Sequence, residues 1–296
     1  MENTVIILSG PTASGKTAAA IEVAKHFNSK IISADSRQCF RELNIGVARP
    51  SEEELRAVKH FFIASHSVKE KLTANDFENF ALTKVNELFE TNPVVVMVGG
   101  TGLYIKAFCE GLDPIPAVDD SLRANLSWQY NQNGLKWLQD QVKSRDPEFW
   151  KVAEQQNPQR LLRALEVLEG TGKSILEFRK GIKLQRPFRI VKTAIDIPGE
   201  KLHENIRLRV HRMFESGLVE EVRSVLPYRH LNALQTVGYK ELFEYFDQKI
   251  SLDEAGEKIA TNTRQYAKRQ LTWFRKDKEI KWLPAEAILP QLKILL

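Results

Sequence analysis

The sequence is poor in the residues that build disulfide and metal frameworks. It has only two cysteines, Cys39 and Cys109, with no C-x-x-C pair, and its six histidines show no metal-ligand spacing. No apolar run approaches the roughly 20 residues that span a bilayer, and no basic leader precedes a small-residue cleavage site. We therefore expect a cytoplasmic chain with reduced, partly buried cysteines, no disulfide framework, no structural zinc and no membrane partner.

The charge and the length of the chain indicate how many domains it forms and where its basic residues lie. The 296 residues carry a net charge of +5 and are 43% hydrophobic, which suits one large or two modest packed domains. The basic surplus is concentrated in residues 256–283, which hold eight basic and three acidic side chains. Helical spacing puts Arg264, Lys268 and Arg275 on one stripe. This stripe fits either a solvated helix face or a surface that contacts backbone phosphates.

A glycine-rich segment follows directly on the apolar run at 5–8. It has the spacing of a P-loop and consists of Gly10, Pro11, Thr12, Ala13, Ser14, Gly15, Lys16 and Thr17. The glycines let backbone N–H groups face a phosphate, the lysine reaches the terminal phosphate, and the threonine hydroxyl holds Mg²⁺ at the positive end of the next helix. These eight residues predict a diphosphate site with Mg²⁺ at Thr17. Nucleoside triphosphates, nucleotide acceptors and prenyl diphosphates all satisfy it equally.

Strand and helix patterns alternate at both ends of the chain. Strands are expected at 5–8, 30–33, 94–98 and 188–197, and helices at 17–27, 76–90 and from 198 to 283. The stretch 121–183 is helical throughout, with turn signals between its helices. The pattern predicts an α/β fold in which a P-loop NTPase-like parallel sheet is flanked by helices. The core is formed by 1–112 and 188–296, and an all-α domain is inserted at 113–187.

Two features lie where predicted strands end. Asp35 ends the second strand, at the same carboxyl edge as the P-loop, where its carboxylate could hold Mg²⁺ through water, accept a proton or cap the following turn. Ser36 could serve equally as a cap. The strand at 94–98 instead runs into Gly99, Gly100 and Thr101, without the carboxylate that NTPases use to secure Mg²⁺. The glycines are expected to let a ligand approach the backbone, and the missing acid favours a transferase.

Seven blocks, in order along nearly the whole chain, resemble the tRNA dimethylallyltransferases of the bacterial type. They lie at 10–17, 35–38, 44–50, 99–104, 157–167, 237–241 and 263–270. The resemblance implies transfer of a dimethylallyl group from dimethylallyl diphosphate to the N6 amine of the adenosine 3′-adjacent to the anticodon, in tRNAs that read codons starting with U. The implied partners are a tRNA anticodon stem-loop and the prenyl diphosphate, and we expect a monomer.

The resemblance also implies roles for individual residues. Asp35 is the general base, while Lys16, Thr17 with Mg²⁺, and Arg209 stabilise the leaving diphosphate, with Arg207 as an alternative to Arg209. The resemblance also implies a channel that tRNA enters from one end and the prenyl diphosphate from the other, with Thr101 lining it. The residues expected to face the tRNA are Asp35, Ser36, Arg37, Gln38, Thr101, Arg123, Gln159, Arg160, Arg163, Arg264, Lys268 and Arg275. The sequence departs from the family pattern at several positions, including Arg37, where Met is common, and Asn205, where Arg is frequent.

Two other classes of protein share some of these features. A P-loop small-molecule kinase would have the same loop and strand-end carboxylate, together with a nucleotide-base pocket and an arginine-bearing lid. A non-catalytic RNA-binding module with a vestigial loop is disfavoured because Lys16, Thr17 and Asp35 are all intact.

Overall fold

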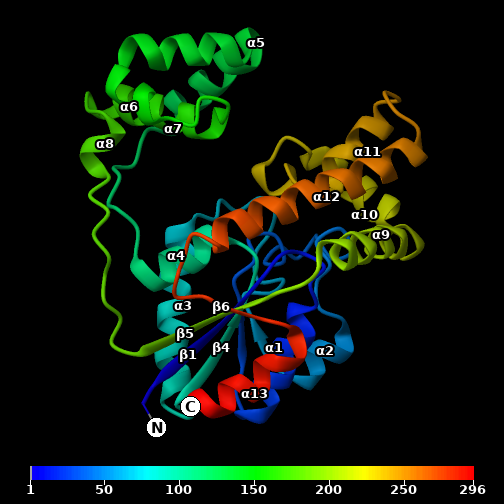
Figure 1. Ribbon diagram of the computed structural model, residues 1–296. Coiled ribbons are helices and arrows are strands. Elements are labelled where there is room, and N and C mark those ends of the chain that lie inside the picture. Colours follow the sequence, from blue (N-terminus) through cyan, green and yellow to red (C-terminus); the bar gives the residue numbers. More distant parts are fainter. Residues whose placement is uncertain (1) are drawn as a thin grey trace. The chain divides into compact units, whose positions relative to one another are not determined.

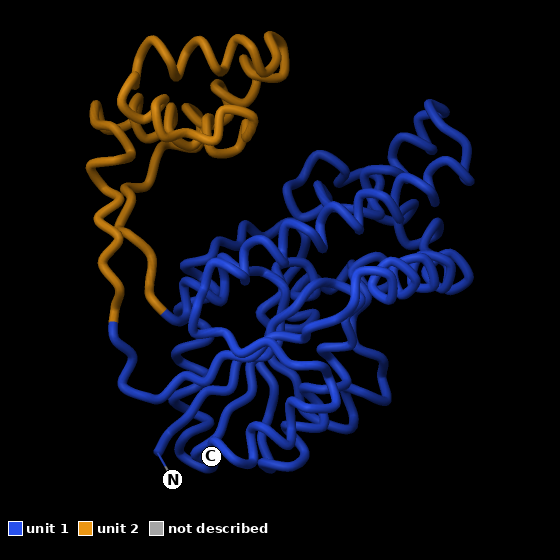
Figure 2. The backbone as a smooth tube through the Cα atoms, viewed as in Figure 1, with its two compact units in different colours: residues 1–109, 185–296 blue, residues 110–184 orange. Residues whose placement is uncertain are grey.

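The computed structural model describes residues 2–296 and divides into two compact units (Figure 2). The larger unit comprises residues 1–109 and 185–296, and the smaller comprises residues 110–184. The smaller unit begins and ends three residues before the predicted insertion at 113–187. Among the described residues, no helix is both long and apolar enough to cross a membrane.

The larger unit contains one six-stranded sheet in the order β3-β2-β4-β1-β5-β6, and every neighbouring pair is parallel. This confirms the predicted parallel sheet. The strands are β1 (Thr4–Ser9), β2 (Ile31–Ser33), β3 (His60–Phe61), β4 (Val94–Val98), β5 (Arg189–Ile195) and β6 (Lys281–Leu283). Because the strands are parallel, the loops that follow β1, β2 and β4 meet at one edge of the sheet.

Helices cover both faces of this sheet (Figure 1). The larger unit has the helices α1 (Lys16–His26), α2 (Glu52–Ala57), α3 (Ala74–Phe89), α4 (Gly102–Glu110), α9 (Gly199–Glu215), α10 (Leu218–Val225), α11 (Tyr239–Phe246), α12 (Leu252–Phe274) and α13 (Ala285–Leu295), with 3₁₀ turns at Leu226–Tyr228 and Asn232–Leu234. Side chains of β1 alternate between two cores: Ile6 and Leu8 pack with α1 and α13, whereas Val5 and Ile7 pack with α3 and α4.

The helices α9 to α12 lie above the carboxyl edge of the strands (Figure 1). A small core formed by Leu202, Ile206 and Ala267 joins α9 to α12 and contacts Ala13 of the P-loop. This packing holds two long helices against the loop that the sequence predicts to bind phosphate.

We expected helix as far as residue 283, and this is wrong for the last residues of that range. Residues Lys281–Leu283 form β6, which extends the sheet beside β5. The strand β3 was also not predicted. Both strands are two or three residues long and lie at the two edges of the sheet, where they are incompletely buried. Such short segments show no period of apolar side chains from which a strand could be recognised.

The smaller unit is helical, with its own core. Its helices are α5 (Asp120–Arg145), α6 (Pro147–Val152), α7 (Pro158–Thr171) and α8 (Ile175–Phe178). The predicted turn signals act as helix boundaries: Asp146 and Asn157 cap α6 and α7 through their side chains, and Gly172 ends α7 in a left-handed conformation. Gly134 has φ of 75° and kinks α5. The core includes Leu138, Phe149, Leu161 and Leu165.

Candidate active site

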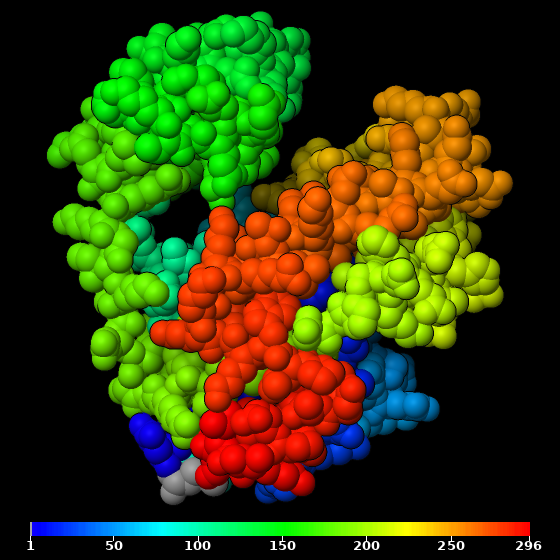
Figure 3. Space-filling view, in the orientation of Figure 1, coloured from blue at the N-terminus to red at the C-terminus, as the bar shows by residue number. Residues whose placement is uncertain are grey.

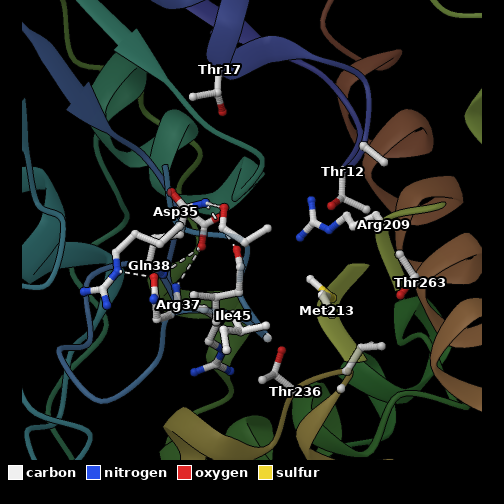
Figure 4. Close-up of a pocket in the computed structure, with 18 of the residues that line it drawn as sticks. Thr12, Thr17, Asp35, Arg37, Gln38, Ile45, Arg209, Met213, Thr236 and Thr263 are labelled. Carbon is white, nitrogen blue, oxygen red and sulfur yellow. Dashed lines mark hydrogen bonds between the residues drawn. The ribbon is translucent and has the colours of Figure 1, made fainter. Parts of the chain in front are cut away.

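A cavity of about 1600 Å³ lies in the larger unit, at the carboxyl edge of the sheet (Figure 4). The P-loop, the segment after β2, α9, the segment before α11 and α12 all contribute to its walls. Of the predicted catalytic residues, Lys16, Thr17, Asp35 and Arg209 line it together. Segments far apart in the sequence therefore converge on the site that the P-loop predicts.

The P-loop has the conformation that an anion site requires. Ala13 has φ of 63° and Gly15 has φ of 86°, and no side chain caps the first turn of α1. The hydroxyl of Ser14 is buried and, within residues 2–296, has no hydrogen-bond partner. A buried polar atom beside uncapped helix amides fits the oxygens of a bound phosphate.

Two of the cations that line this cavity, Lys16 and Arg209, interact with the charge of Asp35. Burial lowers the pKa of Lys16 to about 8, although the charge of Asp35 raises it and that of Arg209 lowers it further. Burial also lowers the pKa of Arg209 below its ordinary value, against the opposing effect of Asp35. Figure 4 shows the guanidinium of Arg209 directed into the space near Asp35. Two cations that share one nearby carboxylate favour a ligand with more than one negative charge.

The carboxylate of Asp35 serves as a cap through one oxygen. Its Oδ1 atom accepts hydrogen bonds from the backbone N–H of Arg37 at 2.9 Å and of Gln38 at 3.2 Å (Figure 4). No hydrogen bond in residues 2–296 involves Oδ2. The capping role of Asp35 is therefore compatible with the other two roles considered for it, because the capping bonds fix the carboxylate and leave one oxygen for a substrate or an ion.

Two more of the predicted residues are joined beside Asp35. The hydroxyl of Thr101 accepts a hydrogen bond from the Ser36 backbone N–H at 3.0 Å, and it lies 3.3 Å from the Ser36 hydroxyl. This contact connects the segment after β2 to the segment after β4.

The glycines after β4 are packed closely against protein groups, and Gly99 also lines the cavity, so the expectation that a ligand approaches their backbone stays a prediction. A Cβ atom on Gly99 would lie 2.2 Å from the Ala34 carbonyl oxygen, and one on Gly100 would lie 2.2 Å from Nε2 of Gln270. The buried side chain of Gln270 accepts a hydrogen bond from Thr12 N–H at 2.8 Å and donates one to the Gly100 carbonyl at 2.9 Å. One residue of α12 thereby joins the P-loop to the end of β4.

The predicted residues on α12 lie outside the cavity lining. Lys268 is exposed on this helix, which Figure 3 shows in orange at the surface of the larger unit, and Arg275 is exposed directly after the last residue of the helix. Arg264 donates to the Thr261 hydroxyl at 2.9 Å, and the guanidinium of Arg275 lies 5.8 Å from the ring centre of Trp282. Arg207 of α9 is exposed and does not line the cavity either, which favours Arg209 as the residue beside the diphosphate.

The remaining predicted residues belong to the smaller unit. Arg123 and Arg163 both pair with the buried carboxylate of Glu166, at 3.2 and 3.1 Å, so each has a role within this unit. Arg160 pairs with Glu154 at 2.6 Å on the surface, and Gln159 is exposed beside it at the start of α7.

Comparisons with known proteins decide the family. A family model described as IPP transferase matches residues 38–277. The chain belongs to this family. It is 49% identical to the tRNA dimethylallyltransferase of Christiangramia forsetii over 95% of this chain and 93% of that protein. It is 45% identical to the tRNA dimethylallyltransferase of Cytophaga hutchinsonii over 94% of this chain and 91% of that protein.

Solved structures agree with this assignment. The full-length tRNA isopentenylpyrophosphate transferase of Bacillus halodurans superposes with a TM-score of 0.73 and 30% identity, covering 99% of this chain and 95% of that one. A eukaryotic dimethylallyltransferase acting on tRNA shares the fold, with a TM-score of 0.79, 22% identity and coverage of 99% and 78%. The predicted family, the enzyme class and the P-loop NTPase-like fold are confirmed.

Two residues that shape this IPP transferase site, Gln270 and Asn205, were not predicted to belong to it. Gln270 was recognised only as part of a family block, and Asn205 only as a departure from the family pattern. The Asn205 side chain donates to the Ala13 carbonyl at 3.0 Å, and thus supports the P-loop from α9. A polar residue on an otherwise apolar helix face is the one signal that could have indicated either contact.

Proposed function

We propose that this chain transfers a dimethylallyl group from dimethylallyl diphosphate to the N6 amine of the adenosine 3′-adjacent to the anticodon, in tRNAs that read codons starting with U. The observation that carries the proposal is the convergence of Lys16, Arg209 and Asp35 on one cavity of an IPP transferase. The cations suit a leaving diphosphate, and the carboxylate suits a nucleophile that must lose a proton.

The diphosphate of the donor binds against the P-loop. The uncapped amides of α1, the orphaned Ser14 hydroxyl, Lys16 and Arg209 supply its hydrogen bonds and positive charge. The hydroxyl oxygen of Thr17 is a ligand of the type that Mg²⁺ prefers, and that ion would add positive charge to the diphosphate.

The dimethylallyl group occupies the apolar part of the same cavity. Val210 and Met213 follow Arg209 on α9 and line the cavity with Ile45 and Val47. Figure 4 shows Met213 next to Arg209, on the side toward Thr236. An arginine at the diphosphate followed by apolar side chains matches a ligand with a charged head and a hydrocarbon tail.

The reaction forms one carbon–nitrogen bond and breaks one carbon–oxygen bond. The N6 amine attacks C1 of the dimethylallyl group as the bond between C1 and the diphosphate oxygen breaks. The proton lost by N6 passes to Oδ2 of Asp35, and Lys16 and Arg209 stabilise the charge that gathers on the diphosphate. A general base of this kind contributes about 10²–10⁴ in rate.

The tRNA supplies the adenosine as a base extruded from its loop, which costs a few kcal/mol of stacking. The predicted contacts are Ser36, Arg37, Gln38 and Thr101 at the base, and basic side chains of α12 and of the smaller unit at the RNA backbone. Lys268 and Arg275 are exposed in a manner that suits phosphate contact.

The decisive experiment incubates the enzyme with unmodified tRNA, Mg²⁺ and dimethylallyl diphosphate, followed by mass spectrometry of the nucleosides. N6-(dimethylallyl)adenosine at the position 3′ of the anticodon is the expected product. A parallel reaction with radiolabelled ATP and no tRNA tests the small-molecule kinase. ATP turnover there, with no prenylated nucleoside in the first reaction, would overturn the proposal.

A further inference from the structure

One carboxylate on α10 holds the wall of the cavity formed by residues 44–48. Glu221 accepts backbone hydrogen bonds from Asn44 at 3.0 Å and Ile45 at 2.7 Å through Oε2, and from Gly46 at 2.9 Å through Oε1. The phenol of Tyr239 donates a fourth bond to Oε1 at 2.6 Å. Hydrogen bonds to an ionised acceptor are stronger than neutral ones, so four of them fix this segment firmly to α10 and α11.

The packing at this point leaves no freedom for the segment to shift toward α11. The ring of Tyr239 is fully buried, and a Cβ atom on Gly46 would lie 2.6 Å from it. The segment also carries backbone strain, because Ala48 has φ of 43°. A non-glycine residue keeps such a conformation only where its surroundings enforce it.

The other side of the segment is bonded to a residue of the active site. The Gln38 side-chain amide donates to the carbonyl oxygens of Val47 at 3.3 Å and Ala48 at 2.9 Å. The backbone N–H of Gln38 in turn donates to Oδ1 of Asp35 at 3.2 Å. Hydrogen bonds at the two ends of segment 44–48 therefore connect Glu221, through the backbone of this segment and through Gln38, to Asp35.

We propose that Glu221 is a positioning residue, which fixes the general base Asp35 through segment 44–48 and Gln38. The inference rests on the proposed function and deepens it, because it identifies what holds the base and the cavity wall beside the target adenine. It also gives a physical reason for two of the sequence blocks. The block at 44–50 supplies the backbone amides, and the block at 237–241 supplies the phenol, that bind the carboxylate of Glu221.

The test substitutes Glu221→Gln, which keeps the length and volume of the side chain but replaces one acceptor oxygen by an amide donor. Glu220→Gln is the matched control, since Glu220 precedes it on the same helix and is exposed. Steady-state prenyl transfer is measured with saturating tRNA and dimethylallyl diphosphate. A base displaced by about 1 Å costs about 10²-fold in rate, so kcat of Glu221→Gln should fall by about that factor.

The inhibition constant for inorganic diphosphate separates positioning from general damage. The diphosphate is proposed to bind against the P-loop, and in residues 2–296 the hydrogen bonds that support this loop do not involve segment 44–48, so this constant should stay within about twofold of wild type. Glu220→Gln should match wild type in both parameters. A lower kcat with an unchanged inhibition constant supports the positioning role, whereas an unchanged kcat overturns it.

A double-mutant cycle with Gln38→Ala tests whether Glu221 acts on Asp35 through Gln38. If Glu221 acts through Gln38, then Glu221→Gln should lower kcat by less than about threefold in the Gln38→Ala background, because the connection is already broken. The same loss of kcat in both backgrounds would overturn the route. Should Glu221→Gln not fold, Tyr239→Phe removes one donor and keeps the ring, with an expected loss of about fivefold in kcat. An undiminished kcat in Tyr239→Phe would then overturn the inference.

Failure of the inference is distinguishable from failure of the proposed function. Absence of prenyl transfer by the wild-type enzyme overturns the function itself. If the wild-type enzyme transfers the prenyl group and the Glu221→Gln variant does so at the same rate, only the positioning role of Glu221 is overturned.

Discussion

The side-chain amide of Asn205 on α9 donates a hydrogen bond of 3.0 Å to the Ala13 carbonyl oxygen in the P-loop. Ala13 is itself in a left-handed conformation, with φ of 63°. The bond thus supports a strained turn whose amides are to bind the donor diphosphate. Because Arg209 lies four residues later on the same helix, α9 both braces the loop and contributes a cation to the cavity.

Asn205→Ala should therefore weaken donor binding more than RNA binding. Loss of one hydrogen bond of about 1 kcal/mol corresponds to a rise of about fivefold in KM for dimethylallyl diphosphate. The dissociation constant for tRNA, measured by filter binding, should not change. His203→Ala is a suitable control, since His203 is exposed on the same helix. An unaltered donor KM in Asn205→Ala would remove Asn205 from the binding machinery.

Donor affinity should depend on pH through Lys16. Burial lowers the pKa of this lysine to about 8 in the donor-free protein. A bound diphosphate favours the ammonium and raises the pKa again, so binding takes up a proton once the free enzyme has lost it. Affinity is therefore fully present below a pH of about 8 and should fall by up to about tenfold per pH unit above it.

Titration calorimetry with dimethylallyl diphosphate from neutral to alkaline pH measures this dependence. Lys16→Met should bind the donor weakly and lose the alkaline decline. Lys25→Met, which changes an exposed lysine of the same helix, should behave as wild type. If Lys16→Met showed the same decline as wild type, another group would be responsible.

Asp35→Asn separates the capping role of this residue from its role as base. The amide oxygen can still accept the N–H bonds of Arg37 and Gln38, so the local fold and tRNA affinity should stay within about 1 kcal/mol of wild type. Proton transfer from N6 is lost, and the single-turnover rate should fall by about 10²–10⁴. A single-turnover rate equal to that of wild type would reject Asp35 as the general base.

Local patterns predicted the parts of the fold whose signals are contiguous. The P-loop and the strand Val94–Val98 could be recognised because each occupies one uninterrupted run of residues. Contacts between distant residues gave no such signal: Gln270 bonds to Thr12 across 258 positions, and Asn205 bonds to Ala13 across 192. Such pairs depend on how α9 and α12 pack over the sheet edge, which periodicity does not specify.

The glycines after β4 show the same limitation. A glycine marks a place where the backbone needs space, but the sequence does not say what fills it. At Gly100 the neighbour is the amide of Gln270, a residue of α12 that precedes β6. The edge strand β6 was missed for a related reason, since its pairing with β5 determines its conformation and its three residues show no pattern of their own.

Gln270→Leu should reveal how much the site depends on this one contact between α12 and the sheet edge. Leucine has a similar volume but leaves the Thr12 N–H and the Gly100 carbonyl without their partner, and each buried, unsatisfied group costs about 1–3 kcal/mol. The free energy of unfolding in urea should fall by at least about 2 kcal/mol, and KM for dimethylallyl diphosphate should rise because Thr12 belongs to the P-loop. Gln265→Leu, at an exposed position of the same helix, controls for added apolar surface. Equal stabilities of the two variants would show that the buried amide does not hold the loop to the sheet.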